Sequence, residues 1–123
     1  MEEIILDTNI LIEILKNNKD TIKVVNQYEI HIISEISKME LFYGSLDKRE
    51  LIKLNKFVSI FNIVPINESI SNIASDLIFK YANSHKLDIP DSLIAATALY
   101  HNKALFTYNV KDFRYIENIK LVD

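Results

Sequence analysis

Four acidic residues stand at places where a folded chain would bring carboxylates together. Each lies beside an apolar segment, either where a short strand would end or on a helix that packs onto the core. Carboxylate oxygens select Mg²⁺ or Mn²⁺ over zinc. One or two such ions polarise a phosphodiester and lower the pKa of a bound water, which in-line hydrolysis of that bond requires. The four candidates for catalysis and metal binding are Asp7, Glu40, Asp91 and Asp112.

Glu40 gives the strongest single signal. Ile36, Met39 and Tyr43 are its neighbours at helical spacing, so the glutamate faces the interior or its rim. Burying an unpaired carboxylate is costly, and the positions four residues away hold Ile36 and Gly44 rather than a basic residue. A metal ion is the economical partner, although a basic residue elsewhere in the chain would serve the same purpose.

Each of the three aspartates also has an ordinary structural explanation. Asp7 can cap a helix, Asp91 can interact as an anion with a helix dipole, and Asp112 can be a turn residue. One aspartate in such a place is therefore weak evidence for catalysis, and the case depends on whether the fold brings the three together.

Other familiar chemistries lack their residues. The chain has no cysteine, which excludes disulfide scaffolds, thiolate zinc sites and cysteine nucleophiles. The spacing of His31, His85 and His101 matches no zinc motif. Gly44 is the only glycine, so the chain has neither a glycine-rich phosphate loop nor the nucleophile elbow of a serine hydrolase.

The composition predicts one domain spanning residues 1–123. An apolar fraction of 49% is enough for a core without disulfides. The net charge of -3 argues against a protein that coats DNA through phosphate contacts, but not against an enzyme that reaches phosphate through metal ions. No run approaches the roughly 18 apolar residues of a membrane span, and residues 1–7 lack the features of a signal peptide. We therefore expect a cytoplasmic protein without a membrane span.

Short apolar runs alternate with helical patterns, which predicts an α/β fold with a mainly parallel central sheet and helices on both faces. In such sheets ligands bind outside the carboxyl ends of the strands. Asp7, Asp91 and Asp112 would then converge on one rim. We expect four to five short strands, at 3–6, 31–33, 63–66, 104–107 and, at the edge, 119–122, and helices at 10–16, 20–27, 34–44, 47–61, 67–81 and 91–102.

Cap residues set several of these boundaries. Ser34, Asp47 and Asn67 are expected to cap helix starts, since short polar side chains accept hydrogen bonds from the free backbone N–H groups there. Pro90 suits the start of a helix, where its missing N–H costs nothing. Gly44 suits the position just after a helix, where left-handed residues are common.

Four segments follow one another in a recognisable order. They are Leu6-Asp7-Thr8-Asn9, then Met39-Glu40-Leu41 with Tyr43-Gly44, then Pro90 to Ala98, then Thr107 to Phe113. This series resembles PIN-domain ribonucleases, and most of all the VapC-type toxins of bacterial toxin–antitoxin pairs. A strand ending in Asp-Thr-Asn is weak alone, whereas the last two segments together are specific. The resemblance spans essentially the whole chain and implies a PIN-like three-layer fold.

The resemblance also implies an activity and partners. It implies a Mg²⁺-dependent endoribonuclease, with Mn²⁺ as a substitute, that acts on an RNA substrate, forms a homodimer and is silenced by a cognate antitoxin. Asp7, Glu40 and Asp91 match the family's acidic triad. The fourth acidic position falls on Asp112, but Asn109 stands where some relatives carry an acid, so the fourth ligand stays open.

Three polar residues accompany the carboxylates. Asn9, Thr107 and Asn109 are candidates for orienting carboxylates or substrate. Asp88 lies close to Asp91 in the chain, but the Leu-Ile-Ala-Ala stretch after Asp91 favours Asp91 as the family position.

An apolar patch outside the core would supply the dimer interface. We expect it in one region of the chain, where four large apolar residues are close together. These residues are Ile36, Leu41, Phe42 and Leu46.

Two other functions fit the fold class. A receiver-type regulatory domain also binds Mg²⁺ through acidic residues at strand ends, but no adjacent acidic pair follows the first strand here. An inactive partner-binding module is the third alternative. All four acidic positions are filled, which counts against loss of activity.

Overall fold

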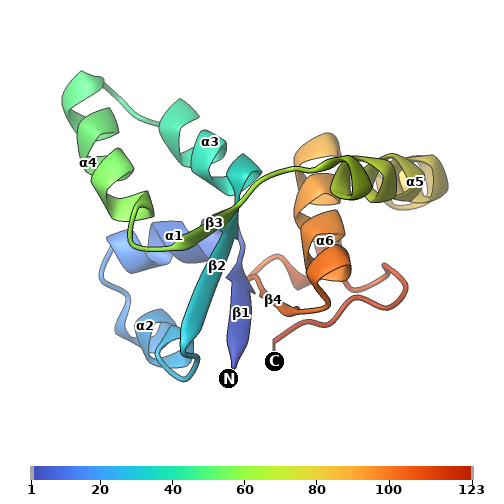
Figure 1. The fold of residues 1–123 in the computed structure, drawn as a ribbon, viewed down its shortest axis with the longest axis horizontal. Coiled ribbons are helices and arrows are strands. Elements are labelled where there is room, and N and C mark those ends of the chain that lie inside the picture. Colours follow the sequence, from blue (N-terminus) through green and yellow to red (C-terminus); the bar gives the residue numbers. More distant parts are fainter. Residues whose placement is uncertain (1, 123) are drawn as a thin grey trace.

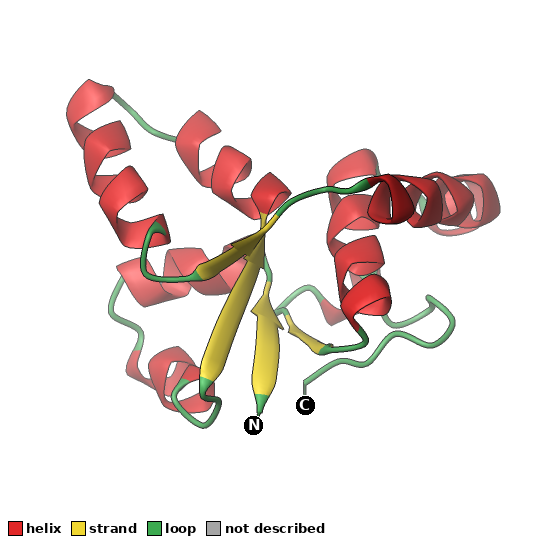
Figure 2. Cartoon of the chain, viewed as in Figure 1, coloured by secondary structure: helices red, strands yellow, loops and turns green. Residues whose placement is uncertain are grey.

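The computed structural model describes residues 2–122. Four strands alternate with six α-helices and one short 3₁₀ helix, as the apolar runs and helical patterns predict (Figure 2). The strands are β1 (Glu3–Leu6), β2 (Ile30–Ser34), β3 (Asn62–Val64) and β4 (Ala104–Phe106). The helices are α1 (Thr8–Leu15), α2 (Lys19–Val25), α3 (Glu35–Tyr43), α4 (Lys48–Val58), α5 (Glu68–His85), α6 (Ile89–His101) and η1 (Val110–Asp112).

All four strands run parallel in the order β3-β2-β1-β4. Ile4 pairs with His31 of β2 on one side and with Ala104 of β4 on the other, so β1 lies inside the sheet. Because every strand points the same way, the residues that follow β1, β2 and β4 all emerge at one edge. The α/β fold with a parallel sheet is therefore confirmed.

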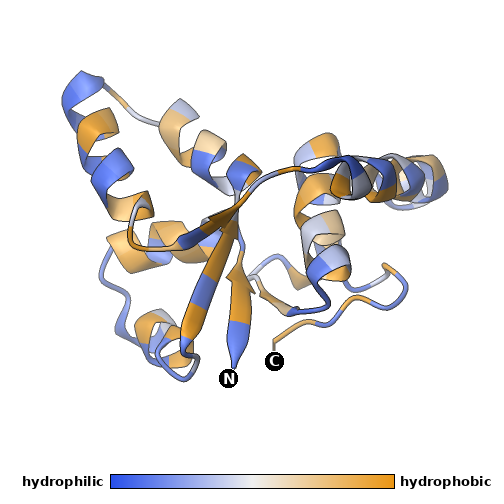
Figure 3. Ribbon diagram, in the orientation of Figure 1, coloured by the Kyte–Doolittle hydropathy of each residue, from blue (hydrophilic) through white to orange (hydrophobic). Residues whose placement is uncertain are grey.

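Alternate residues of β1 face opposite sides of the sheet, as the pleat requires. Ile5 joins a core formed with α5, α6 and the segment after β4. Ile4 and Leu6 join a second core, formed with α1, α3 and α4. Figure 1 shows α5 and α6 on one side of the sheet and α1, α2 and α4 on the other, and Figure 3 shows how strongly apolar the strands between them are.

Cap residues explain most of the observed boundaries. Ser34, Asp47 and Asn67 accept backbone hydrogen bonds at the starts of α3, α4 and α5, as predicted. Helix α1 begins two residues earlier than predicted, because Asp7 caps it directly after β1. Gly44 corrects another prediction: its φ is -80°, so the position is right-handed and the backbone does not require glycine.

The expected fifth strand is only partly present. Leu121 makes a single parallel bridge with Leu105 of β4, supported by the bond from the Leu105 N–H to the Lys120 carbonyl (2.8 Å). This bridge closes the outer edge of β4. Helix α5 is one turn longer than predicted and ends at His85, since Lys86 adopts a left-handed φ of 58°.

Helix α6 is buried nearly all round, as its sequence predicts. Its Ile94, Ala95 and Ala96 are at most 1% exposed, and Thr97 donates its hydroxyl proton to the Leu93 carbonyl (2.7 Å) instead of leaving it unpaired. Among residues 2–122, no helix combines the length and apolar character that crossing a membrane requires.

The predicted apolar patch is wrong in three of its four residues. Leu41 is buried in the second core, Phe42 packs against that core, and Ile36 packs against the first one. Only Leu46 is largely exposed. Helix α3 places Leu41 inward and Met39 and Tyr43 outward, which the helical spacing alone did not distinguish.

Candidate active site at the carboxyl edge of the sheet

Carboxylates from separate parts of the chain meet beyond the carboxyl ends of β1, β2 and β4. Asp7 follows β1, Glu40 lies on α3 after β2, Asp91 lies in the first turn of α6, and Asp112 ends η1 after β4. Burial raises the pKa of Asp91, and the negative charges of Asp88, Asp7, Asp112 and Glu40 all raise it further. The three aspartates and the glutamate therefore share one electrostatic environment.

Asp7 is held by three donors. Its Oδ1 accepts the Thr8 N–H (2.8 Å), and its Oδ2 accepts the Thr107 hydroxyl (2.7 Å) and the Asn9 amide (3.3 Å). The side chain is nearly inaccessible, and burial raises the pKa of its carboxyl despite the bonds from Thr107 and Thr8. Asp7 therefore caps α1 and also presents a carboxylate whose orientation is fixed.

Glu40 has one close partner. The Thr8 hydroxyl donates to its Oε1 (2.6 Å) and lies 3.0 Å from the Ser37 hydroxyl. Burial is the main cause that raises the pKa of Glu40, and the charges of Asp7 and Asp88 add to it. The glutamate is half-buried at the rim, and Thr8 connects it to the residue next to Asp7.

Asp91 is the most perturbed acid of the group. Its backbone N–H donates to Oδ1 of Asp88 (2.9 Å), which caps α6. Burial, followed by the charge of Asp88, raises the pKa of Asp91 from its ordinary value of 3.8 to about 7. At neutral pH and without a cation, the Asp91 carboxyl is therefore only partly ionised.

Asp112 and Asn109 both lie on the exposed segment after β4. Asn109 donates its backbone N–H to the Thr107 hydroxyl (3.0 Å), and its side chain makes no cap bond. Asp112 raises the pKa of both Asp7 and Asp91. This coupling favours Asp112 over Asn109 as the fourth acidic group.

Among residues 2–122, no lysine or arginine forms an ion pair with Asp7, Glu40, Asp91 or Asp112. The ion pairs found among residues 2–122 all lie elsewhere: Lys16–Glu13, Lys38–Glu35, Lys80–Glu117 and Lys103–Glu3. A donor set made of carboxylates, hydroxyls and amides, without thiolate or imidazole, suits Mg²⁺ or Mn²⁺.

The spacing of the carboxylates limits how an ion could be held. Within the described residues, no three acidic or histidine side chains lie close enough to hold a single ion between them. Mg²⁺ keeps several of its waters and is usually held by one or two carboxylates. The donor set therefore fits such an ion with water completing its coordination.

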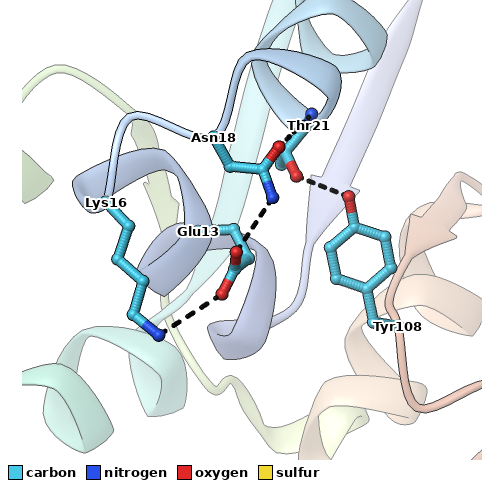
Figure 4. A network of polar contacts seen from close by, with 5 residues as sticks. All are labelled: Glu13, Lys16, Asn18, Thr21 and Tyr108. Atoms are coloured by element: carbon cyan, nitrogen blue, oxygen red, sulfur yellow. Dashed lines mark hydrogen bonds and ion pairs between the residues drawn. The ribbon is translucent and has the colours of Figure 1, made fainter.

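A second polar network secures the loop after β4. Tyr108 reaches across to the fully buried Thr21 of α2, and their hydroxyls form a hydrogen bond (Figure 4). Asn18 caps α2 and donates its side-chain amide to Glu13 (2.9 Å), which pairs with Lys16. The backbone N–H of Tyr108 donates to Asn9 (3.2 Å), so this network fixes the loop on the side that faces Asp7.

Comparison with known proteins identifies the family. The PIN-domain family model matches residues 4–118. Ribonuclease VapC1 of Rickettsia felis is 32% identical, over 97% of this chain and 94% of that protein. The chain belongs to the PIN-domain family of VapC ribonucleases. Ribonuclease VapC19 of Mycobacterium tuberculosis is a further relative of this PIN domain, 32% identical over 89% of this chain and 90% of that protein.

Solved structures agree with this assignment. A toxin–antitoxin complex from Klebsiella pneumoniae superposes on the PIN domain with a TM-score of 0.80 and 30% identity, covering 97% of this chain and 95% of that chain. VapBC2 from Rickettsia felis, bound to a DNA fragment from its promoter, gives a TM-score of 0.80 at 28% identity, covering 98% and 97%. The strand order 3-2-1-4 also differs from the 2-1-3-4-5 order of receiver-type domains, so that alternative is not favoured.

Sequence reasoning missed two polar residues of this PIN domain. Thr8 had no predicted role, yet its hydroxyl donates to Glu40. The only sequence signal for this contact was its place between Asp7 and Asn9. Asp88 was not included in the predicted site. It caps α6, and after burial its charge is the largest cause that raises the pKa of Asp91. The signal that could have identified Asp88 was its position three residues before Asp91. This is the position of a helix cap, so both carboxylates lie at the same end of α6.

The raised pKa of Asp91 gives a pH dependence with a defined sign. Between about pH 4 and about pH 7 the folded chain binds more protons than the unfolded chain, so the free energy of unfolding falls as the pH rises. Allowing for solvent screening of this half-buried group, we expect a loss of about 1–2 kcal/mol, most of it absent in Asp91→Asn. Urea unfolding without metal, at pH 5 and pH 8, measures it.

The exposed Asp76 of α5 provides the matched control. Asp76→Asn should keep the wild-type pH dependence, because it leaves the carboxylate cluster intact. A wild-type chain that becomes more stable between pH 5 and pH 8, or an Asp91→Asn variant that loses as much stability as the wild type, would contradict this electrostatic description.

Proposed function

We propose that this PIN domain is a Mg²⁺-dependent endoribonuclease, with Mn²⁺ as a substitute, and that its site is the carboxylate cluster. The observation that carries the proposal is electrostatic. Asp7, Glu40 and Asp91 all have raised pKa values, and none of them pairs with a cation among residues 2–122. Buried carboxylates without a cationic partner destabilise the folded chain, and groups with such raised pKa values cluster at functional sites.

In this proposal Asp7 and Asp91 hold the principal ion, while Glu40 and Asp112 complete the acidic pocket or hold a second one. A bound Mg²⁺ would supply Lewis-acid chemistry there, polarising the phosphodiester and lowering the pKa of the water used for hydrolysis. The chain fixes the carboxylates for this purpose. Thr107 and Asn9 orient Asp7 through hydrogen bonds. The Thr8 hydroxyl donates to Oε1 of Glu40, which leaves Oε2 free to bind an ion or one of its waters.

Basic residues beside Asp112 can bind the RNA backbone. Tyr108, Lys111, Asp112 and Arg114 line an open cavity of about 450 Å³ after β4. Lys111 and Arg114 are exposed, and neither is in an ion pair within the described residues. We assign them to phosphate contacts, which would offset the repulsion between RNA and the acidic site.

The partners follow from the relatives. The structural neighbours from Klebsiella pneumoniae and Rickettsia felis are toxin–antitoxin complexes at 30% and 28% identity, which supports a toxin role for this chain with a cognate antitoxin as its inhibitor. We further propose a homodimer. Met39, Tyr43, Leu46 and Ile89 are large apolar side chains that remain exposed. Met39 and Tyr43 line one open cavity together with Pro90, so we place the interface there instead of at the patch predicted from the sequence.

The activity is tested by cleavage of a structured RNA. We expect cleavage to require Mg²⁺ or Mn²⁺, to stop with EDTA, and to leave 5′-phosphate and 3′-hydroxyl ends, because water rather than the ribose 2′-hydroxyl attacks. Glu40→Gln keeps the shape and removes the charge, so the rate should fall by about 100-fold or more. Glu35→Gln, on the same helix but paired with Lys38, should keep nearly the wild-type rate.

Two results would overturn this activity. Cleavage that survives EDTA would exclude the metal, and products ending in 2′,3′-cyclic phosphate would exclude water as the nucleophile. A folded Glu40→Gln variant as active as Glu35→Gln would remove Glu40 from the site.

The partners are tested by co-expression with the product of the neighbouring reading frame. We expect the two proteins to purify as one complex that no longer cleaves RNA, and the free PIN domain to sediment as a dimer at micromolar concentration. A strictly monomeric chain would contradict the dimer. A neighbouring product that neither binds nor inhibits the chain would contradict the toxin assignment.

A further inference from the structure

An aromatic stack stands at the end of α5. The rings of His85 and Tyr115 are parallel within 7°, with their centroids 4.0 Å apart. Tyr81 supports both from the edge, at 5.0 Å from Tyr115 and 5.7 Å from His85. We call His85 and Tyr115 the aromatic wall.

The aromatic wall borders the carboxylate cluster. His85 and Tyr115 line a small cavity of about 80 Å³ with three carboxylates and one lysine, the whole lining being His85, Lys86, Leu87, Asp88, Asp91, Asp112 and Tyr115. Burial and the charges of Asp91, Asp112 and Asp88 raise the pKa of Tyr115, in keeping with this position. The stack is therefore adjacent to the proposed site of phosphodiester hydrolysis.

The two rings are not equally needed by the fold. Tyr115 is half-buried and packs against the first core, so it anchors the segment after η1. His85 is exposed, yet its ring is held in place by Tyr115 on one face and by a 2.8 Å hydrogen bond between Nδ1 and the Ser84 hydroxyl. An exposed ring that is fixed in this way is already ordered for a planar ligand.

We propose that the His85 ring is a stacking platform for the nucleotide base that flanks the scissile phosphate. The proposal rests on the ribonuclease function proposed above. Unpaired bases stack on tyrosine and histidine rings, and the stacking tolerates any base because each has a π face. Three carboxylates line the cavity beside this ring against one lysine, Lys86, so the balance of charge there disfavours another phosphate and favours a neutral base.

The test compares variants of two histidines that end helices. His85→Ala should raise the KM for a short RNA by about tenfold with kcat nearly unchanged, whereas His85→Phe retains a ring and should restore the KM. His101 is the matched control, because it ends α6 and lies edge-on to Tyr100 at 5.0 Å. His101→Ala should cleave like the wild type.

A set of RNAs identifies the base that stacks. Each RNA carries one abasic nucleotide on one or the other side of the cleavage site. At one of the two positions, the abasic nucleotide should raise the wild-type KM by the same factor of about ten. It should not raise the KM of His85→Ala any further, because both changes remove the same stacking contact.

Three outcomes would overturn the assignment. In the first, His85→Ala cleaves RNA like His101→Ala. In the second, the increase in KM caused by His85→Ala adds in full to the increase caused by each abasic nucleotide. In the third, His85→Ala lowers the melting temperature and kcat while KM stays unchanged, which would make His85 a structural residue. In all three, wild-type cleavage would leave the ribonuclease function intact. A wild-type chain that cleaves no RNA would overturn both the function and the platform.

Discussion

The burial of neighbouring carboxylates at the carboxyl edge of the sheet is the constraint on which the site depends. The parallel order β3-β2-β1-β4 brings the residues after three strands to this edge, and the start of α6 brings Asp91 there. Burial and mutual repulsion then raise the pKa of Asp91 to about 7. A divalent cation is the simplest way to remove this cost, so the feature that destabilises the folded chain is also the one that prepares it to bind metal.

Hydroxyl and amide donors hold the cluster in place without neutralising it. Thr107 and Asn9 fix Asp7, and Thr8 fixes Glu40, each through bonds to neutral groups. A lysine or arginine in any of these positions would have lowered the pKa of the acids and competed with a metal ion. Neutral donors set the direction of each carboxylate and leave its charge available, which is the combination that a metal-dependent nuclease requires.

Much of this arrangement could be predicted from the sequence because it depends on local patterns. Apolar runs locate the strands, and the position of Asp7 after a strand is enough to place it at the edge. Thr8 and Asp88 could not be assigned, since their importance comes from contacts with Glu40 and Asp91 that lie outside their own segments. The apolar patch failed for a related reason: Leu41 and Met39 are both apolar residues of α3, and only packing decides which is buried.

The most direct test measures protons released when metal binds. Calorimetric titration of Mg²⁺ at pH 7, in two buffers of different ionisation heat, reports both binding and proton release. Saturable binding should release about half a proton from Asp91, whose pKa is near 7, and Asp91→Asn should abolish that release. No binding, or binding with equal proton release in the wild type and in Asp91→Asn, would contradict a site in which Mg²⁺ relieves the repulsion among these carboxylates.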